Sequence, residues 1–414
     1  MKKNLLLLHL ESLNLLNYRT NLELFPTIRE LEKQCIIFDR YYSTATSTLM
    51  VIGDLLYGGM NQYEGCASLS DIPKEYCYPS SLFDDLKEQG YHAGIYIYPD
   101  GGDRESAEAR HIVGFHNRME LIRDYSKYIN TFDSIMNRQP FALMACNYIS
   151  NFSFAKYADV SNYGMDTDYW EAGYRCMDCC CGDLLRLLKD KKLMDDTIIV
   201  LYGDHGGDYW GHGEHSGLTH AIEPNNLLIH TPLIIWDGIH RKESEHDPRL
   251  IQTSDLREII IALLNGKSIE NLPNRKYTIS RNEYAAQPIR AESFNKAYSV
   301  TEGRYLLMVS NTGLEMYDTK MDPACQNNVL RFFVYENRIL KSNVENAEIF
   351  QRHFAYFWNN REQRILRQKF YELRDVLYDK VLELYMSGER SEIDMLDEMK
   401  FGKIDINVDK EIGQ

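Results

Sequence analysis

Short apolar runs alternate with segments of helical spacing along the first 240 residues of the chain. The apolar runs predict strands at 4–10, 35–38, 91–98, 140–149, 197–203 and 228–236. Between them, FPTIRELEKQ, SLFDDLKEQG and the long stretch 169–196 place apolar residues on one face of a helix. Strands separated by helices predict an α/β fold, with a mostly parallel sheet covered by helices on both faces.

The pattern changes after about residue 270. KYTISRNEYA, AYSVTEGRYLLMVS and GLEMYDT are shorter, more polar segments that predict a small antiparallel subdomain, and the charged, aromatic stretch that follows predicts helix. We therefore expect an α/β domain over 1–270, a C-terminal α+β subdomain over 271–335 and a helical tail over 336–414. The tail is expected to pack on the main domain or on a second copy of the chain, which would make it the contact of a homo-oligomer.

Composition narrows the range of partners and compartments. With 46 Lys and Arg against 61 Asp and Glu, the net charge of -15 disfavours nucleic acid as a partner. The sequence contains no run of about 18 apolar residues, so it predicts no membrane span. The apolar run after Lys3 is too short for a secretory signal. The nine cysteines are an odd number without the spacing of a disulfide framework, so we expect a reduced, cytoplasmic protein.

The densest group of chemically active residues is YGDHGGDYWGHGEHSGLTH at 202–220, directly after a predicted strand. Ligands of open α/β sheets bind at the carboxyl ends of strands. Asp204 and His205 are the residue types that bind borderline metals such as Mn²⁺ and Zn²⁺. A polar glycine loop with solvated histidines is the alternative interpretation.

Two further segments would open onto the same edge of the sheet. Glu11 follows the first apolar strand, although such a carboxylate is often merely exposed. The hydroxyl cluster STATST at 43–48 precedes an apolar helical stretch. A Thr in that place commonly caps the helix. The same position sets its hydroxyl in the positive end of the helix dipole, where an attacking alkoxide and an anionic substrate are both stabilised.

Together these segments resemble the sulfatase family of the alkaline phosphatase superfamily. Phe38, Tyr42, Thr48 and Gly58 match its nucleophile-loop pattern F-x-x-x-Y-x(5)-C/S/T-x(9)-G without a gap. Other segments similar to family motifs are FPTIRELEKQCIIF, LLRLLKDKKLMDDTIIVLYGDHG, HTPLIIW and EMYDTKMDPACQNNV. The resemblance covers residues 4–330 and implies an alkaline-phosphatase-like fold for that part of the chain.

The resemblance also implies roles for individual residues. Glu11, Asp204 and His205 match metal ligands of the family, and Thr48 matches the nucleophile that also binds the metal. Glu11-Ser12 combined with Asp-His is similar to the branch that transfers phosphoglycerol or phosphoethanolamine. The metal that we expect is Mn²⁺, with Zn²⁺ or Ca²⁺ as alternatives.

The sulfate-cleaving branch of the family oxidises a Cys or Ser within C/S-x-P-x-R to formylglycine. Here the matching segment is Thr-Leu-Met-Val-Ile at 48–52, so formylglycine is not expected. Thr46 competes with Thr48 as nucleophile, because TATS at 44–47 also resembles the T-x-T element of the phosphoethanolamine-transferring enzymes. The spacing to Phe38 and Gly58 favours Thr48.

Several cationic positions of the family are replaced in this chain, notably by Leu306 where a late Lys is usual. The residues left to contact an anionic substrate are Asn151, where a His is usual, and His212 and His215 in the glycine loop. His220 lies nearest to the family's anion-contacting Lys or His and is the second expected catalytic residue.

The sequence therefore predicts a metal-dependent hydrolase that cleaves a phosphate ester, or a sulfate ester, through a Thr nucleophile. Its substrate would be a small anionic ester and could include a modified sugar. Two alternatives stay open at this point. One is a transferase that passes a phospho group to a sugar or glycerol hydroxyl, and the other is a non-catalytic family member that binds an anion.

Overall fold

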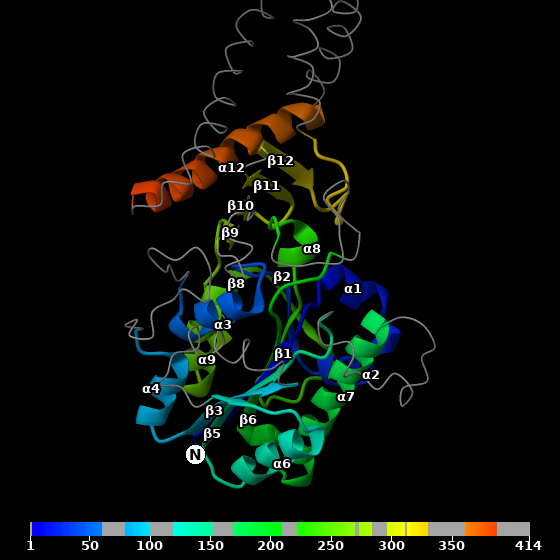
Figure 1. Cartoon of the computed structure of the whole chain (residues 1–414), viewed down its shortest axis with the longest axis vertical. Coiled ribbons are helices and arrows are strands. Elements are labelled where there is room, and N and C mark those ends of the chain that lie inside the picture. The colour runs from blue at the N-terminus through cyan, green and yellow to red at the C-terminus, as the bar shows by residue number, and fades with distance from the viewer. Residues whose placement is uncertain are drawn as a thin grey trace, which may run out of the picture.

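A computed structural model describes residues 2–59, 79–99, 119–151, 169–208, 222–269, 273–283, 296–310, 313–329 and 361–386. These residues form a large α/β layer with a smaller sheet above it, crossed by one long helix (Figure 1). The chain begins at the far end of the large sheet from the small one, at the point marked N.

The large sheet has eight strands in the order β4-β3-β5-β1-β6-β7-β2-β8. All pairs are parallel except those made by β7, which is antiparallel to both of its neighbours. The strands are β1 Asn4–Leu10, β2 Ile36–Tyr42, β3 His92–Tyr98, β4 Met119–Leu121, β5 Phe141–Asn147, β6 Thr197–Gly203, β7 Leu233–Trp236 and β8 Glu245–Gln252. The predicted mostly parallel sheet is confirmed.

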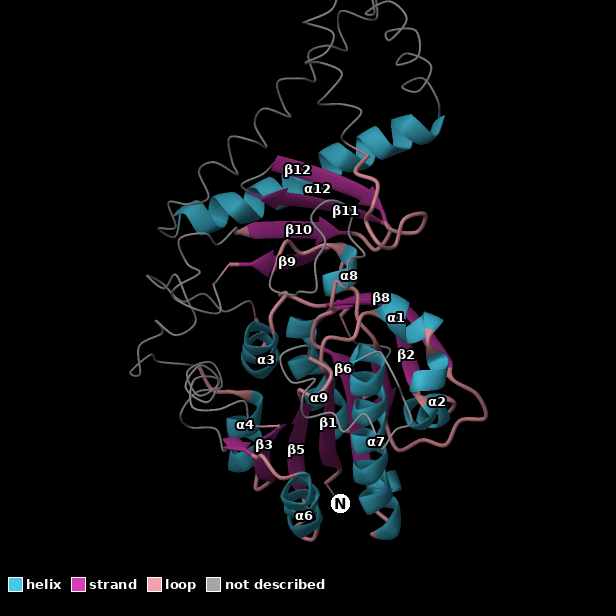
Figure 2. Ribbon diagram, turned by 45° about the vertical axis from the view of Figure 1, so that its right-hand side comes forward, coloured by secondary structure: helices cyan, strands magenta, loops and turns pink. Residues whose placement is uncertain are grey.

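Helices cover both faces of this sheet (Figure 2). One face carries α3 Thr48–Tyr57, α4 Leu82–Glu88 and α9 Leu256–Leu264, and the other carries α1 Leu15–Thr20, α2 Pro26–Glu32, α6 Tyr125–Met136 and α7 Tyr169–Asp190. Within β1, Leu5 and Leu7 enter the first core while Leu6 and Leu8 enter the second. A strand buried on both faces needs a continuous apolar run, which is why NLLLL does not alternate with polar residues.

The smaller sheet is antiparallel and contains β9 Thr278–Asn282, β10 Ala297–Thr301, β11 Tyr305–Ser310 and β12 Gly313–Asp318 in sequential order. One of its faces packs on α12 Arg361–Met386 through Leu373, Leu377 and Val381. The small antiparallel sheet is thus confirmed. The predicted boundaries at 270 and 335 and the role of the tail in oligomerisation stay predictions.

Residues 228 and 229 differ from the sequence-based prediction, which placed the start of a strand there. They belong to the short helix α8, Asn226–Ile229, because the Asn225 side chain accepts a hydrogen bond from the Leu227 N–H and begins a turn. The strand β7 starts only after Pro232. The remaining short turns are η1 Leu22–Leu24, η5 Met194–Asp196 and η7 Thr253–Asp255.

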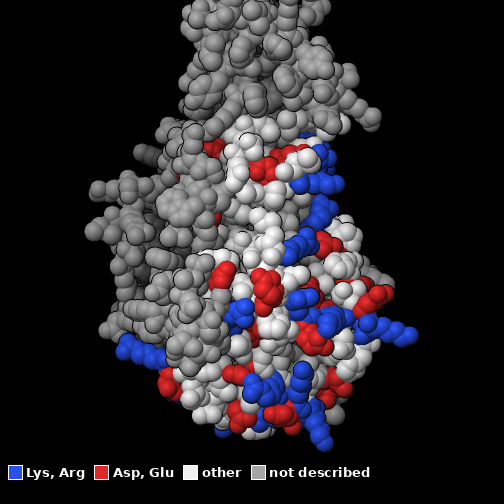
Figure 3. All heavy atoms as spheres, turned by 90° about the vertical axis from the view of Figure 1, so that its right-hand side faces the viewer, with Lys and Arg blue, Asp and Glu red and all other residues white. Residues whose placement is uncertain are grey.

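Both signs of charge occur together on the surface. On the face shown in Figure 3, Lys and Arg are interspersed with Asp and Glu over the lower part of the molecule. Among the helices that the structure describes, none is both long enough and apolar enough to cross a membrane.

Candidate active site and metal centre

The register of the large sheet brings two distant carboxylates to one edge. β1 lies between β5 and β6, and Leu10 pairs with Gly203 across the parallel β1–β6 ladder. The residues that follow, Glu11 and Asp204, therefore leave neighbouring strands side by side. Both are fully buried, with no exposed side-chain surface. This edge is the carboxyl end of the strands, where open α/β sheets bind their ligands.

A tight turn after β1 fixes the orientation of Glu11. Ser12 has φ +55°, a left-handed conformation that costs a non-glycine residue energy and has to be stabilised by its surroundings. The Ser12 N–H donates to Asp204 Oδ1 at 3.0 Å, and the Tyr174 hydroxyl donates to the Ser12 carbonyl at 2.8 Å. Ser150 Oγ donates to the Glu11 carbonyl at 2.7 Å. The turn thus joins the two carboxylates into one rigid group.

The hydroxyl of Thr48 points at this group. Thr48 is the first residue of α3, and its Oγ1 lies 3.2 and 3.3 Å from the two carboxylate oxygens of Glu11 and 3.0 Å from His205 Nε2. At the N-terminus of a ten-residue helix, the free N–H groups and the helix dipole stabilise negative charge. The structure therefore brings together the four residues that the sequence assigns to the metal and the nucleophile.

His205 is oriented as a ligand. Its Nδ1 lies 2.8 Å from the carbonyl oxygen of Gly206, which can only accept a hydrogen bond. Nδ1 therefore carries the proton, and in the neutral ring the lone pair of Nε2 faces Thr48 and Asp204. The backbone of the loop is tied down as well, since the Gly206 N–H donates to the Leu228 carbonyl at 2.8 Å.

His9, which the sequence analysis did not select, completes the cluster. It lies on β1, is buried, and its Nε2 is 3.0 Å from Glu11 Oε2 and 3.3 Å from Asp204 Oδ2. The available signal was an imidazole two residues before the strand-end acid inside an apolar run.

The charges in the cluster shift the ionisation of its members. Burial alone would lower the pKa of His9, but Asp204 and Glu11 outweigh it and raise this pKa to about 9. Burial likewise opposes ionisation of Asp204, yet His205 and His9 hold its pKa well below the ordinary range. Asp204 thus depends on positive charge beside it.

This donor set fits a divalent metal. Two carboxylates, two imidazole nitrogens and a hydroxyl converge in a buried place, and His9, Glu11 and Asp204 offer atoms within 4.8 Å of one another. In the described part of the chain, neither carboxylate has a Lys or Arg within ion-pair distance. Asp204 Oδ2 is buried there without a well-aligned hydrogen bond, although two imidazole nitrogens lie 3.3 Å away. Nitrogen and carboxylate ligands are those that Mn²⁺ and Zn²⁺ accept.

The other predicted site residues fall into two groups. The Asn151 amide donates to Glu11 Oε1 at 2.8 Å, so this side chain lies in the site. The expected substrate contacts His212 and His215 lie outside the described residues, and so does His220, the second expected catalytic residue. The hydroxyl of Thr46, the competing nucleophile, lies 3.0 Å from the Ile222 carbonyl and 3.2 Å from Asn282 Oδ1, contacts that Thr48 does not share.

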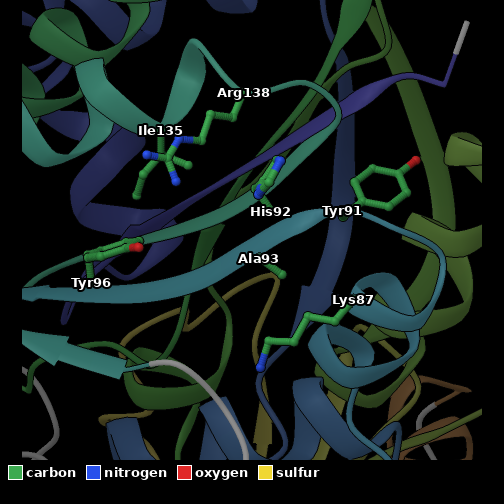
Figure 4. Close-up of a pocket in the computed structure, with 7 residues that line it drawn as sticks. All are labelled: Lys87, Tyr91, His92, Ala93, Tyr96, Ile135 and Arg138. Atoms are coloured by element: carbon green, nitrogen blue, oxygen red, sulfur yellow. The ribbon is translucent and has the colours of Figure 1, made fainter.

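A separate pocket lies at the opposite end of the large sheet, where β3 begins (Figure 4). It is lined by Lys87, Tyr91, His92, Ala93, Tyr96, Ile135 and Arg138. Because it opens at the amino end of β3, it lies away from the carboxyl edge that carries the metal-binding cluster, and it has no part in that cluster.

Comparison with known families agrees with this geometry. A family model described as Sulfatase matches residues 3–266, which is more than half of the chain. The chain belongs to the sulfatase family. Both carboxylates, both imidazoles and Thr48 lie inside the matched range. No curated protein matches the chain.

Solved structures of sulfatase-family and related proteins share the fold. A 2-O GAG sulfatase superposes with a TM-score of 0.58 at 16% identity, over 89% of this chain and 93% of its own. A protein of the alkaline phosphatase superfamily from Vibrio parahaemolyticus gives 0.54 at 18% identity, over 81% and 88%. The phosphonate monoester hydrolase of Agrobacterium radiobacter gives 0.56 at 12% identity, over 85% and 96%. The sulfatase-family protein is thus built on the alkaline-phosphatase-superfamily fold.

Proposed function

We propose that this sulfatase-family protein is a metal-dependent hydrolase that cleaves a small phosphate ester through a covalent intermediate on Thr48. The observation that carries the proposal is the position of Thr48 Oγ1, about 3 Å from both Glu11 and His205 at the N-terminus of α3. A hydroxyl there has an acceptor for its proton and a positive end of a helix for its developing charge.

The proposed reaction has two displacements at phosphorus. A divalent metal held by Glu11, Asp204 and His205 would lower the pKa of the Thr48 hydroxyl and neutralise charge on the transferred group. Thr48 Oγ1 forms a bond to phosphorus as the bond to the leaving alkoxide breaks. The Thr48 hydroxyl gives up one proton toward Glu11. The leaving alkoxide takes up one proton to become an alcohol, so the number of protons does not change. Water then attacks phosphorus, breaks the bond to Oγ1 and restores the Thr48 hydroxyl as phosphate leaves.

The nucleophile loop favours phosphate over sulfate. Residues 48–52 offer neither the Cys or Ser nor the Pro and Arg of the formylglycine segment. Solved structures of this fold include a phosphonate monoester hydrolase and a protein in complex with its substrate D-glucosamine-2-N,6-O-disulfate, so substrates with phosphorus and with sulfur both occur among them. A modified sugar ester stays within the proposed substrate class. Asn151, which already contacts Glu11, would be one of its contacts, with His212, His215 and His220 as further candidates.

The test is turnover of an aryl phosphate monoester, an aryl phosphodiester and an aryl sulfate by the full chain with Mn²⁺, Zn²⁺ or Ca²⁺. We expect metal-dependent cleavage of a phosphate ester, fastest with Mn²⁺. Thr48→Ala should lower kcat by at least 10³-fold, because the nucleophile itself is removed. Thr46→Ala is the matched control, since it removes a hydroxyl two residues away, and it should retain kcat within about tenfold.

Other results would change the proposal in definite ways. If Thr46→Ala abolishes turnover while Thr48→Ala does not, the nucleophile is misassigned. Cleavage of the aryl sulfate alone would move the substrate class to sulfate esters. Stoichiometric metal binding without turnover of any ester would refute hydrolysis and leave the phospho-group transferase or the anion-binding protein.

A cytoplasmic location is also part of the proposal. It is supported by the free thiols of Cys35, Cys146, Cys180, Cys181 and Cys325 in the described part of the chain. Proteins that mature under oxidising conditions usually place their cysteines in disulfides.

A further inference from the structure

His9 is the member of the cluster to which no motif of the sequence assigns a role. We propose that His9 binds the same metal as Glu11 and Asp204 through Nε2, so that the site holds two imidazole ligands rather than one. This inference rests on the metal site of the proposed function.

The spacing of the atoms around His9 is that of ligands sharing one ion. Its Nε2 lies 3.0 Å from Glu11 Oε2 and 3.3 Å from Asp204 Oδ2. Metal–ligand bonds of about 2.0–2.2 Å place neighbouring ligand atoms roughly 3.0 Å apart in an octahedron and roughly 3.4 Å apart in a tetrahedron. Two edges of the triangle formed by these three atoms therefore match the spacing of neighbouring ligands of a single ion, and His9, Glu11 and Asp204 all offer atoms within 4.8 Å of one another.

The surroundings of His9 hold Nε2 in this direction. The other ring nitrogen, Nδ1, lies 3.0 Å from the hydroxyl of Tyr202. Tyr202 also packs edge-on against the ring at 5.4 Å, and Tyr148 covers it from another side at 5.9 Å. A metal-binding histidine commonly fixes its orientation by a hydrogen bond from its second ring nitrogen. Tyr202 stands in that position for His9.

A hydrogen bond from a protonated His9 to the two carboxylates would give the same distances. The two arrangements differ in chemistry, because a bridging N–H keeps His9 outside the coordination shell. As a ligand, His9 would give the site two nitrogens alongside two carboxylates and the Thr48 hydroxyl. That shell favours Zn²⁺ or Mn²⁺ over Ca²⁺, which prefers oxygen ligands.

The experiment counts imidazoles around the metal. The full chain is loaded with Zn²⁺, and X-ray absorption fine structure is recorded for the parent, for His9→Gln and for His92→Gln. We expect at least two imidazoles in the parent, one fewer in His9→Gln and no change in His92→Gln, which alters an exposed histidine on β3. His9→Gln should also weaken Zn²⁺ binding by more than about 100-fold, beyond the 10- to 100-fold typical of a residue that only orients a ligand.

A second variant covers the case in which His9→Gln fails to fold. His9→Glu loaded with Zn²⁺ should still bind the metal with one imidazole fewer than the parent, because a glutamate oxygen reaches about as far from Cβ as Nε2 does. A structural role for His9 would leave the imidazole count unchanged.

The outcomes separate this inference from the proposed function. A parent that binds no divalent metal would overturn both. A parent that binds Zn²⁺ with a single imidazole, or an unchanged imidazole count in a folded His9→Gln or His9→Glu, would overturn the assignment of His9 alone.

Discussion

A buried ion network between the two sheets gives the sharpest prediction about stability. Arg281 on β9 is 1% exposed and donates to Asp54 Oδ1 on α3 and to Glu283 Oε2, each at 2.8 Å. The Arg281 N–H also donates to the Thr44 carbonyl at 3.0 Å. One residue of the small sheet thus holds both the helix that begins at Thr48 and the loop that precedes it.

Arg281→Met removes the cation and leaves Asp54 and Glu283 buried without it. Breaking one side of a buried ion pair costs about 3–5 kcal/mol. Protonation of Glu283 is a cost of similar size, since placing a proton on a carboxyl of ordinary pKa 4.5 at pH 7 costs about 3 kcal/mol, and it leaves only Asp54 as a buried charge. We therefore expect a loss of about 3–5 kcal/mol in the free energy of unfolding at pH 7.

The loss should depend on pH in a definite direction. Burial raises the pKa of Glu283 even beside Arg281, and removal of the cation raises it further. When a carboxyl has a higher pKa in the folded than in the unfolded state, the free energy of unfolding falls as pH rises from the unfolded pKa to the folded pKa. The deficit of Arg281→Met should therefore be larger at pH 7.5 than at pH 5.

Urea unfolding of the metal-free chain at these two pH values measures the deficit. Arg304→Met is the matched control, because Arg304 pairs with Asp318 but its side chain is 47% exposed, and it should cost less than about 1 kcal/mol. A loss below about 1 kcal/mol for Arg281→Met, or a larger loss at pH 5 than at pH 7.5, would refute the reasoning.

Two further predictions concern the loop between β6 and β7. Burial, with Arg19 and Arg40 nearby, lowers the pKa of His230 to about 4, so the stability it contributes is present above pH 6.5 and falls as pH drops toward 4. His230→Gln should remove about 2–3 kcal/mol of the difference in unfolding free energy between pH 7.5 and pH 4.5, and an unchanged difference would contradict this. A Cβ on Gly206 would lie 1.8 Å from the Leu227 carbonyl oxygen, so Gly206→Ala should lower the free energy of unfolding by about 3 kcal/mol or more, measured by thermal unfolding. Gly59→Ala is the control, because a Cβ there would have open space around it, and it should be nearly neutral. Equal melting temperatures for the two variants would count against close packing at Gly206.

Much of the large sheet could be predicted because its strands are buried on both faces. A strand such as β5, FALMACN, has no exposed position and so forms an apolar run that few other structures explain. β8 could not be found in this way. Its sequence EHDPRLIQ begins with exposed polar residues and includes Pro248, and it forms a strand only because it pairs with β2.

The candidate site was predictable where a residue follows a strand or begins a helix. Glu11, Asp204 and Thr48 hold such positions, and the strand order of a parallel sheet brings them to one edge. His9 was not predictable in this way, because it lies within β1. Its importance depends on the pairing of β1 with β6, which decides that Asp204 is within reach. Sequence order contains no information on that pairing.

The different positions of Thr46 and Thr48 show how the small sheet influences the candidate site. One residue, Ser47, separates them, and the sequence distinguishes them only by spacing. In the structure, Asn282 at the end of β9 lies 3.2 Å from the Thr46 hydroxyl, and Ala45 bridges to Arg281 of the same strand. These contacts hold the loop before α3 against the small sheet, and the Thr48 hydroxyl, at the first turn of the helix, faces Glu11. The small sheet therefore contributes to the site by holding the loop that precedes Thr48, although no residue of that sheet belongs to the metal-binding cluster itself.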